Sequence, residues 1–257
     1  MAEDRVSTTH AGHVAIVRLA DPATRNALDG DMQARLAEAL LAAAADDDIR
    51  AIVLTGGDDL FASGADIREL ARTDPMEVMA GRRRVLWDAL ADIRTPIVAG
   101  VAGHVLGGGC ELTLACDLVV AGDTAVIGLP EIRLGIIPGA GGTQRWGRLA
   151  GRLRTAEHVL TGRTVDAWQA LDLGLVNRVV PAQRTVAAAV ALAQEVASMA
   201  PLAAQNATEA LDQIDESPMT AAMDHDRALM SLLLSTRDAT EGLTAFVERR
   251  RPNFEGR

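Results

Sequence analysis

Leu106-Gly107-Gly108-Gly109-Cys110-Glu111-Leu112 decides how the chain folds, because a triple glycine runs directly into an apolar segment that suits a helix. Three consecutive glycines remove every side chain from a short length of backbone, so a ligand can approach its N–H groups. If a helix starts here, its first N–H groups lack intrahelical partners and lie at the positive end of the helix dipole. Glu111 lies one turn after Gly108, which places an amide donor beside a carboxylate. This pair suits polarising a carbonyl while a proton moves; the alternative is close helix packing, with Glu111 complementing the dipole.

Apolar segments around this stretch predict an α/β fold. Residues 50–55 and 96–101 have the composition of buried strands, and a helical pattern with Met32, Leu36 and Leu40 precedes them. Strands that alternate with helices indicate a parallel sheet. Beyond residue 146 the pattern becomes mostly helical. We therefore expect an α/β core over residues 1–199 and a helical region over residues 200–257.

A second loop follows the strand at residues 50–55. Its sequence, Phe61-Ala62-Ser63-Gly64-Ala65-Asp66-Ile67-Arg68-Glu69-Leu70, contains Asp66 and Glu69 at the spacing of a capping box, which predicts a helix from Ile67. The Ala65 N–H then lies at a strand-to-helix junction. Such junctions are where open α/β sheets bind ligands.

Glu131 lies in an apolar setting between Pro130 and Ile132. A carboxylate there would be partly desolvated, which raises its pKa. The alternative is a turn residue paired with an arginine such as Arg133. The glycine-rich run over residues 135–142 allows close packing on either a ligand or a neighbouring helix.

Composition excludes several classes of function. The net charge of −10, the pI near 5.0 and the absence of tyrosine argue against nucleic-acid binding. No apolar window reaches the roughly 18 residues of a membrane span. Cys110 and Cys116 are poorly placed for a disulfide and predict thiols of a reducing compartment, so we expect a cytoplasmic protein. The chain has no lysine, so every basic contact to an anionic ligand must come from arginine.

Together these segments resemble the crotonase family, also called the enoyl-CoA hydratase/isomerase family. The match covers residues 61–70, 103–112, 130–131 with 136–145, and 246–256, and Asn26-Ala27-Leu28 also looks like the family. The resemblance implies a crotonase-like spiral of repeated ββα units. It also implies a C-terminal helical trimerisation region that helps cover CoA, and a homotrimer or a dimer of trimers.

The resemblance further implies an acyl-CoA thioester as substrate, with its carbonyl between the N–H groups of Ala65 and Gly108. The substrate-binding positions that match the family are Ala65, Asp66, Ile67, Arg68, Gly108 and Gly139. No metal or redox cofactor is expected, since coenzyme A is part of the substrate. The family often has lysine at the positions of Arg68 and Arg249, where arginine keeps the charge.

Glu111 and Glu131 match the two catalytic carboxylates of the family's hydratases. Members that only shift a double bond usually keep the second and lack the first, so the resemblance favours a 2-enoyl-CoA hydratase. The alternatives are an isomerase or other crotonase-type enolate chemistry, and a non-catalytic acyl-CoA binding protein. Leu129 replaces a polar residue common in short-chain hydratases, and Trp87 is either a wall of the acyl pocket or a core residue.

Overall fold

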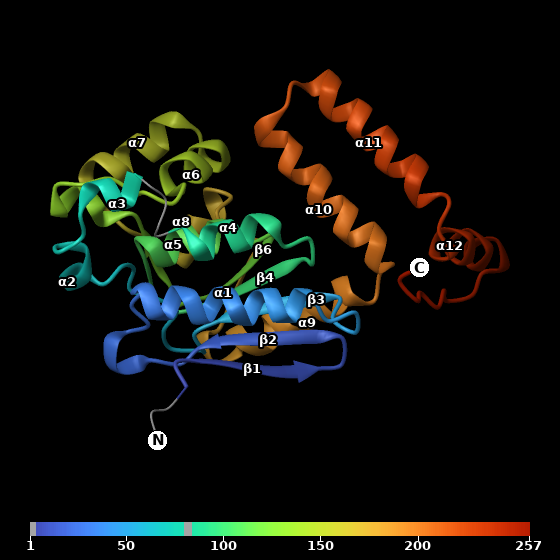
Figure 1. Ribbon diagram of the computed structural model, residues 1–257, viewed down its shortest axis with the longest axis horizontal. Coiled ribbons are helices and arrows are strands. Elements are labelled where there is room, and N and C mark those ends of the chain that lie inside the picture. Colours follow the sequence, from blue (N-terminus) through green and yellow to red (C-terminus); the bar gives the residue numbers. More distant parts are fainter. Residues whose placement is uncertain (1–3, 80–83) are drawn as a thin grey trace.

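The computed structural model describes residues 4–79 and 84–257. Within that part of the chain, six strands form a large sheet and three short strands form a small one (Figure 1). The large sheet has the order β1 (Val6–Ala11), β2 (Val14–Leu19), β3 (Ala51–Thr55), β4 (Ile97–Val101), β6 (Leu118–Gly122) and β9 (Arg178–Val180). The small sheet has the order β5 (His104–Leu106), β7 (Val126–Gly128) and β8 (Val165–Asp166). Parallel pairing from β2 to β9 confirms the predicted α/β class.

Helices cover both faces of the large sheet and continue beyond it. Before residue 140 the helical elements are η1 (Pro22–Thr24), α1 (Gly30–Ala44), α2 (Ile67–Leu70), α3 (Pro75–Met79), α4 (Val85–Asp92), α5 (Gly108–Leu114) and η2 (Pro130–Leu134). After it they are α6 (Gly142–Ala150), α7 (Arg152–Thr161), α8 (Ala167–Asp172), η3 (Ala182–Arg184), α9 (Thr185–Ala197), α10 (Pro201–Glu216), α11 (Met219–Leu233) and α12 (Arg237–Glu248).

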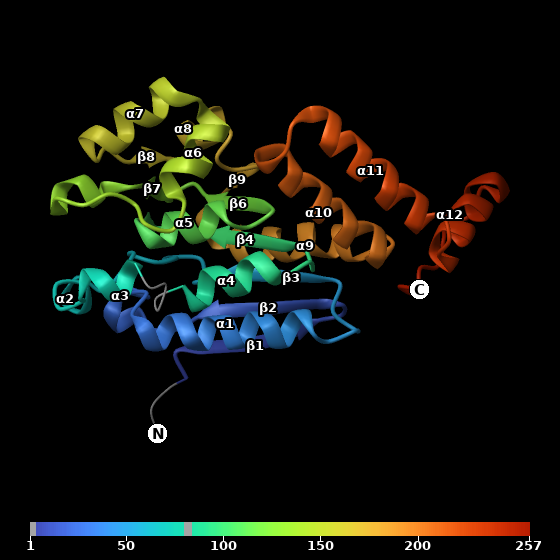
Figure 2. The same cartoon turned by 45° about the horizontal axis from the view of Figure 1, so that its top comes forward.

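The central strands are apolar at every position because both of their faces are buried. Along β3, Ile52 and Leu54 enter the larger core, and Val53 enters a second core with Ala189 and Leu192 of α9. Helix α9 therefore covers one face, while α1 and α4 pack on the other (Figure 2).

Strand pairs β4–β5 and β6–β7 each divide between the two sheets, with the first strand in the large sheet and the second in the small one. Helix α5 follows β5, and η2 with α6 follows β7, so the ββα unit repeats. A parallel bridge between Ala62 and Val105 joins the loop after β3 to the same region. The repeat thus brings together three loops that are far apart in sequence.

Two local features differ from what the sequence pattern indicates. The apolar residues over 75–92 suit one helix with Val78, Val85, Leu86 and Leu90 facing inward, but Val78 and Val85 are 49% and 57% exposed. Helices α3 and α4 are separate elements, and residues 80–83 between them lie outside the described part. Leu86 and Leu90 of α4 are buried. The short strands β5, β7 and β8 were not expected, because two or three residues give no detectable periodicity.

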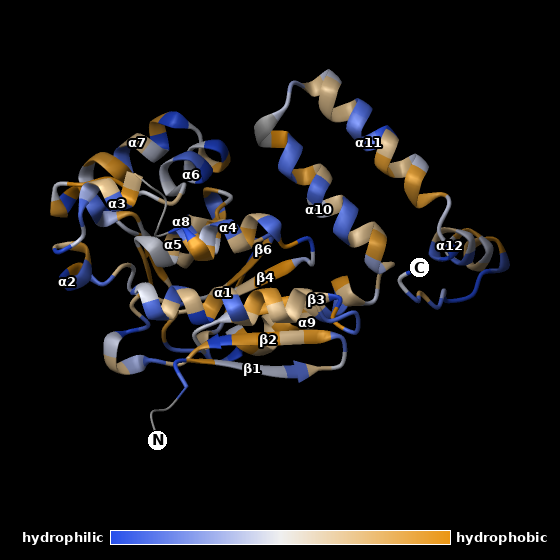
Figure 3. Ribbon diagram, in the orientation of Figure 1, coloured by the Kyte–Doolittle hydropathy of each residue, from blue (hydrophilic) through white to orange (hydrophobic). Residues whose placement is uncertain are grey.

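Helices α10, α11 and α12 extend away from the sheets (Figures 1 and 2). Hydrophilic and hydrophobic residues are interspersed along all three helices (Figure 3). Leu243, Phe246 and Val247 of α12 are 62%, 85% and 81% exposed. In the described residues, no single helix has both the length and the apolarity to cross a membrane. Ala182–Ala197 and Pro201–Ile214 reach that threshold only as a pair, which is bent by 108°.

Candidate active site

The glycines at the start of α5 have separate physical roles. Gly107 has a φ of +52°, which favours glycine, and its N–H donates to Gly128 O at 2.9 Å. A Cβ on Gly109 would lie 2.6 Å from Ala62 O, so this position requires close backbone packing. Gly108 is the first residue of α5, and its N–H therefore has no partner within the helix.

Ala65 and Gly108 lie next to each other, although they are 43 positions apart in the sequence. A Cβ built on Gly108 would lie 3.7 Å from the Ala65 N, and one on Gly64 would lie 3.4 Å from the Gly108 N. In the described part of the chain, neither amide donates a hydrogen bond to another protein group. Two backbone donors without a protein partner among the described residues thus meet at one place.

Asp66 caps α2, whose first residue is Ile67 as predicted. Its Oδ1 accepts from the N–H groups of Arg68 at 2.7 Å and Glu69 at 2.9 Å. The Glu69 Oε2 accepts from Gly30 N at 3.0 Å and so joins α2 to the start of α1. The side chains of Ile67 and Arg68 are exposed beside this cap.

Glu111 is 4% exposed and is held by the backbone of a distant loop. Its Oε1 accepts from Ala140 N at 2.7 Å and from Gly142 N at 2.9 Å. Burial raises the pKa of this carboxyl above its usual value, while the two N–H donors and Arg145 oppose that rise. The carboxylate is therefore fixed in position with one oxygen occupied.

The loop that holds Glu111 is itself anchored by Arg145, whose Nη1 donates to Ala140 O at 2.9 Å. Gly141 has a φ of +97°, and a Cβ on Gly142 would lie 2.8 Å from Glu111 Cγ. Gly139, a predicted substrate-binding residue, is exposed at the edge of this loop. The donors at Ala140 and Gly142 were not foreseen, and the glycine-rich run was the signal for them.

Glu131 has a different environment. It lies on η2, and its Oε2 is buried without a hydrogen-bond partner in the described part of the chain. Its Oε1 would lie 3.1 Å from a Cβ on Gly107, so Glu131 faces the start of α5. Burial and the nearby charge of Glu111 raise the pKa of Glu131 to about 7. Arg133 lies against Gly162, so the alternative pairing of Glu131 with Arg133 is not formed.

Leu129 and Trp87 both contribute to the larger core. Leu129 is 1% exposed and would lie 2.8 Å from a Cβ on Gly142. It therefore supports the loop that donates to Glu111. Trp87 is half-buried and packs against the same core. Of the two interpretations of Trp87, pocket wall or core residue, the contact with the larger core supports the second.

The enoyl-CoA hydratase/isomerase family model matches residues 9–257. The 2,3-dehydroadipyl-CoA hydratase of Escherichia coli (strain K12) is 44% identical over 95% of this chain and 96% of its own length. The crystal structure of an enoyl-CoA hydratase subunit I from Geobacillus kaustophilus HTA426 superposes with a TM-score of 0.95, at 40% identity and over 99% of both chains. That of the enoyl-CoA hydratase from Bacillus anthracis gives 0.93, at 34% identity, over 99% of this chain and 100% of its own.

The chain belongs to the enoyl-CoA hydratase/isomerase family. It is therefore an enzyme, and membership of this family implies an acyl-CoA substrate. The match includes the two loops that present free amides and the two segments that carry the buried carboxylates.

Proposed function

We propose that this protein is a 2-enoyl-CoA hydratase that reversibly adds water across the 2,3-double bond of an enoyl-CoA thioester. The observation that carries the proposal is a pair of carboxylates at the start of α5, Glu111 buried and Glu131 half-buried, with unequal partners. Glu111 accepts two backbone N–H bonds, whereas Glu131 Oε2 has no partner among the described residues. A protein that only binds acyl-CoA has no need to desolvate two such groups together.

The two free amides account for the electrostatic part of the reaction. Hydration of an enoyl thioester builds negative charge on the thioester oxygen. Fixed donors at Ala65 and Gly108 would stabilise this charge without reorganising, and losing one such donor typically costs about 100-fold or more in rate. This assignment also explains why both positions lie beside glycines that permit close approach.

The carboxylates would divide the proton transfers. At Glu111 two amides and Arg145 favour the charged form against the effect of burial, so this carboxyl suits the base that activates water for attack at C3. Glu131, with a pKa of about 7, holds a proton near neutral pH and suits delivery of that proton to C2. Water gives its hydroxyl to C3 and a proton to Glu111, Glu131 gives its proton to C2, and transfer of a proton from Glu111 to Glu131 then restores both carboxyls. No metal or redox cofactor enters this scheme.

The decisive measurement is the loss of enoyl absorbance with a panel of substrates. The panel runs from crotonyl-CoA to longer enoyl-CoA chains and includes 2,3-dehydroadipyl-CoA, which the name of the Escherichia coli relative specifies. Glu111→Gln and Glu131→Gln are each expected to lower kcat by about 100- to 10,000-fold. Glu38→Gln is the matched control, because Glu38 is exposed on α1, and it should keep full activity.

Other outcomes would redirect the assignment. No turnover across the whole panel contradicts a hydratase. Full hydratase activity in Glu111→Gln contradicts the two-carboxylate mechanism and favours a double-bond isomerase. A proline at Gly108 should abolish turnover in a folded protein; retained activity would remove Gly108 from the oxyanion site.

We also propose that the protein is a cytoplasmic homotrimer or dimer of trimers that binds neither nucleic acid nor membranes. The exposed apolar side chains of α12, including Leu243, Phe246 and Val247, support a contact with another copy. Light scattering should give three or six times the mass of the chain. Phe246→Glu should reduce that mass, and a monomeric wild-type protein would contradict this arrangement.

A further inference from the structure

Asn26 lies in a sharp turn that the reaction scheme above does not use. Arg25 and Asn26 have φ angles of +57° and +53°, the left-handed region that residues other than glycine rarely occupy. Asparagine tolerates this conformation better than most residues do. Asn26 is also 2% exposed, so its amide must find partners inside the protein.

The Asn26 side chain joins two loops. Its Oδ1 accepts from Asp21 N at 2.8 Å, and its Nδ2 donates to Phe61 O at 2.7 Å. Its own backbone N–H donates to Asp21 O at 2.8 Å. Both ends of the amide are thus used, one toward the turn and one toward the loop that leads to Ala65.

Two backbone bonds continue this connection along the same loop. Ser63 N donates to Arg25 O at 3.1 Å, and Leu28 N donates to Gly64 O at 2.8 Å. With the Asn26 bond, residues 61, 63 and 64 are each held by the turn at residues 25–28. The next residue is Ala65, whose N–H is one of the two free donors.

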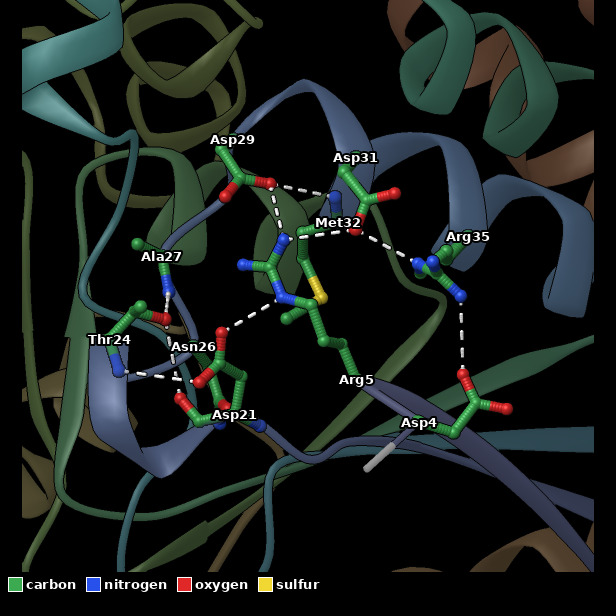
Figure 4. A network of polar contacts seen from close by, with 10 residues as sticks. All are labelled: Asp4, Arg5, Asp21, Thr24, Asn26, Ala27, Asp29, Asp31, Met32 and Arg35. Carbon is green, nitrogen blue, oxygen red and sulfur yellow. Dashed lines mark hydrogen bonds and ion pairs between the residues drawn. The ribbon is translucent and has the colours of Figure 1, made fainter. Parts of the chain in front are cut away.

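The turn itself is anchored to the rest of the fold (Figure 4). Arg5 Nε pairs with Asp21 Oδ2 at 2.8 Å, and Arg5 Nη1 pairs with Asp29 Oδ1 at 2.9 Å. The same Asp29 oxygen accepts from Met32 N and caps α1. These bonds hold the turn in a fixed position relative to helix α1 and to the chain entering β1. The Asn26 side chain in turn holds the loop that leads to Ala65 against the turn.

We propose that Asn26 is a positioning residue that fixes the Ala65 N–H at the distance and angle the thioester oxygen requires. The inference rests on the proposed function, because it assumes that the Ala65 N–H meets the substrate carbonyl. Electrostatic stabilisation needs a donor placed to within a fraction of an ångström, and a shift of about 1 Å can cost about 100-fold in rate. A side chain that holds the loop at both amide ends supplies that precision.

Two substitutions at Asn26 distinguish the role of its side-chain hydrogen bonds from the role of the left-handed turn. Asn26→Gly keeps the left-handed turn and removes both side-chain bonds. Asn26→Asp keeps the size and the bond from Asp21 N, but places an oxygen against Phe61 O. Each is expected to lower kcat about 10- to 100-fold with a much smaller change in KM, since the lost interaction strengthens in the transition state.

Infrared difference spectra of bound [1-¹³C]butyryl-CoA give the carbonyl stretching frequency. A residue that only stabilises the fold would not change this frequency. Wild-type protein should lower this frequency relative to free butyryl-CoA, and both Asn26 variants should lower it less. Asn177→Ala is the control, because Asn177 Oδ1 also accepts a backbone N–H, from Val119 at 2.7 Å, in the β6–β9 region. It should lower the melting temperature and leave the frequency unchanged.

The outcomes distinguish the two proposals. If the wild type neither hydrates any enoyl-CoA nor shifts the carbonyl frequency, the proposed function fails. If the wild type does both and folded Asn26→Gly and Asn26→Asp match it, only the role of Asn26 is overturned. If neither variant folds, or if Asn177→Ala shifts the frequency equally, Asn26 acts through general stability and the positioning role is also overturned.

Discussion

Glu111 and Glu131 lie twenty residues apart in the sequence and face the same helix start, yet their surroundings differ. Glu111 is on the buried helix α5 and has two backbone donors on one oxygen. Glu131 is on the short η2 turn, with a buried oxygen that has no partner among the described residues. Burial raises the pKa of both carboxyls, and at Glu111 two backbone donors oppose that rise, so the partners of a carboxyl matter as well as its burial.

The largest expected effect comes from Gly142→Ala, which should displace the backbone donors of Glu111 and so remove the difference between the two carboxylates. The new Cβ would lie 2.8 Å from Glu111 Cγ and from Leu129 Cδ2, so the loop or the carboxylate must move. We expect kcat to fall about 10- to 100-fold, because the base is no longer aligned with the water. Steady-state kinetics with the best substrate of the panel measure the change.

Gly147→Ala on the same helix is its matched control. A Cβ there would lie 4.0 Å from Thr155, which is an ordinary contact, so activity should be unchanged and stability slightly increased. Equal kinetics in the two variants would show that the backbone donors to Glu111 do not matter for the rate.

The pH dependence of hydration sharpens the comparison. The pKa of Glu131 is raised to about 7, so this carboxyl is protonated below pH 7 and loses its proton as the pH rises through 7. If Glu131 is the proton donor, kcat/KM should fall about tenfold for each pH unit above 7. A pH–rate profile of the wild type tests this, and a flat profile to pH 9 would contradict the assignment.

The same raised pKa has a consequence for stability. The folded state binds the Glu131 proton more tightly than the unfolded chain, so this contribution to stability is present at low pH and is lost as the pH rises through about 7. The stability of Glu131→Gln relative to the wild type should therefore be greater at pH 8.5 than at pH 5. Urea unfolding at the two pH values measures the difference.

The smallest expected effect comes from Arg145→Met. Arg145 lowers the pKa of Glu111 and anchors Ala140, so its loss should raise that pKa and move the acid limb of the profile to higher pH. At pH 6 we expect a decrease in kcat/KM of about two- to threefold, because Arg145 is itself half-exposed and water screens its charge. Arg154→Met is the control, because Arg154 is exposed on α7, and an identical profile for both variants would remove Arg145 from this role.

Much of the fold follows from local patterns. Residues 50–55 and 96–101 were predicted as buried strands, and β3 and β4 occupy them because fully apolar segments need cover on both faces. The helix start after the triple glycine and the start of α2 at Ile67 also follow from the sequence, since each depends on neighbouring residues only. The strands β5 and β7 could not be predicted, because they exist through pairing with each other.

The site shows the same division. The sequence by itself determined that Gly108 would present a free amide, that Asp66 would cap a helix and that Glu131 would lie in an apolar setting, because these are properties of adjacent residues. Only the tertiary structure decided that Ala65 meets Gly108, that Ala140 and Gly142 hold Glu111, and that Asn26 holds Phe61. Those contacts depend on where separate ββα units end in space, which no single stretch of the chain specifies.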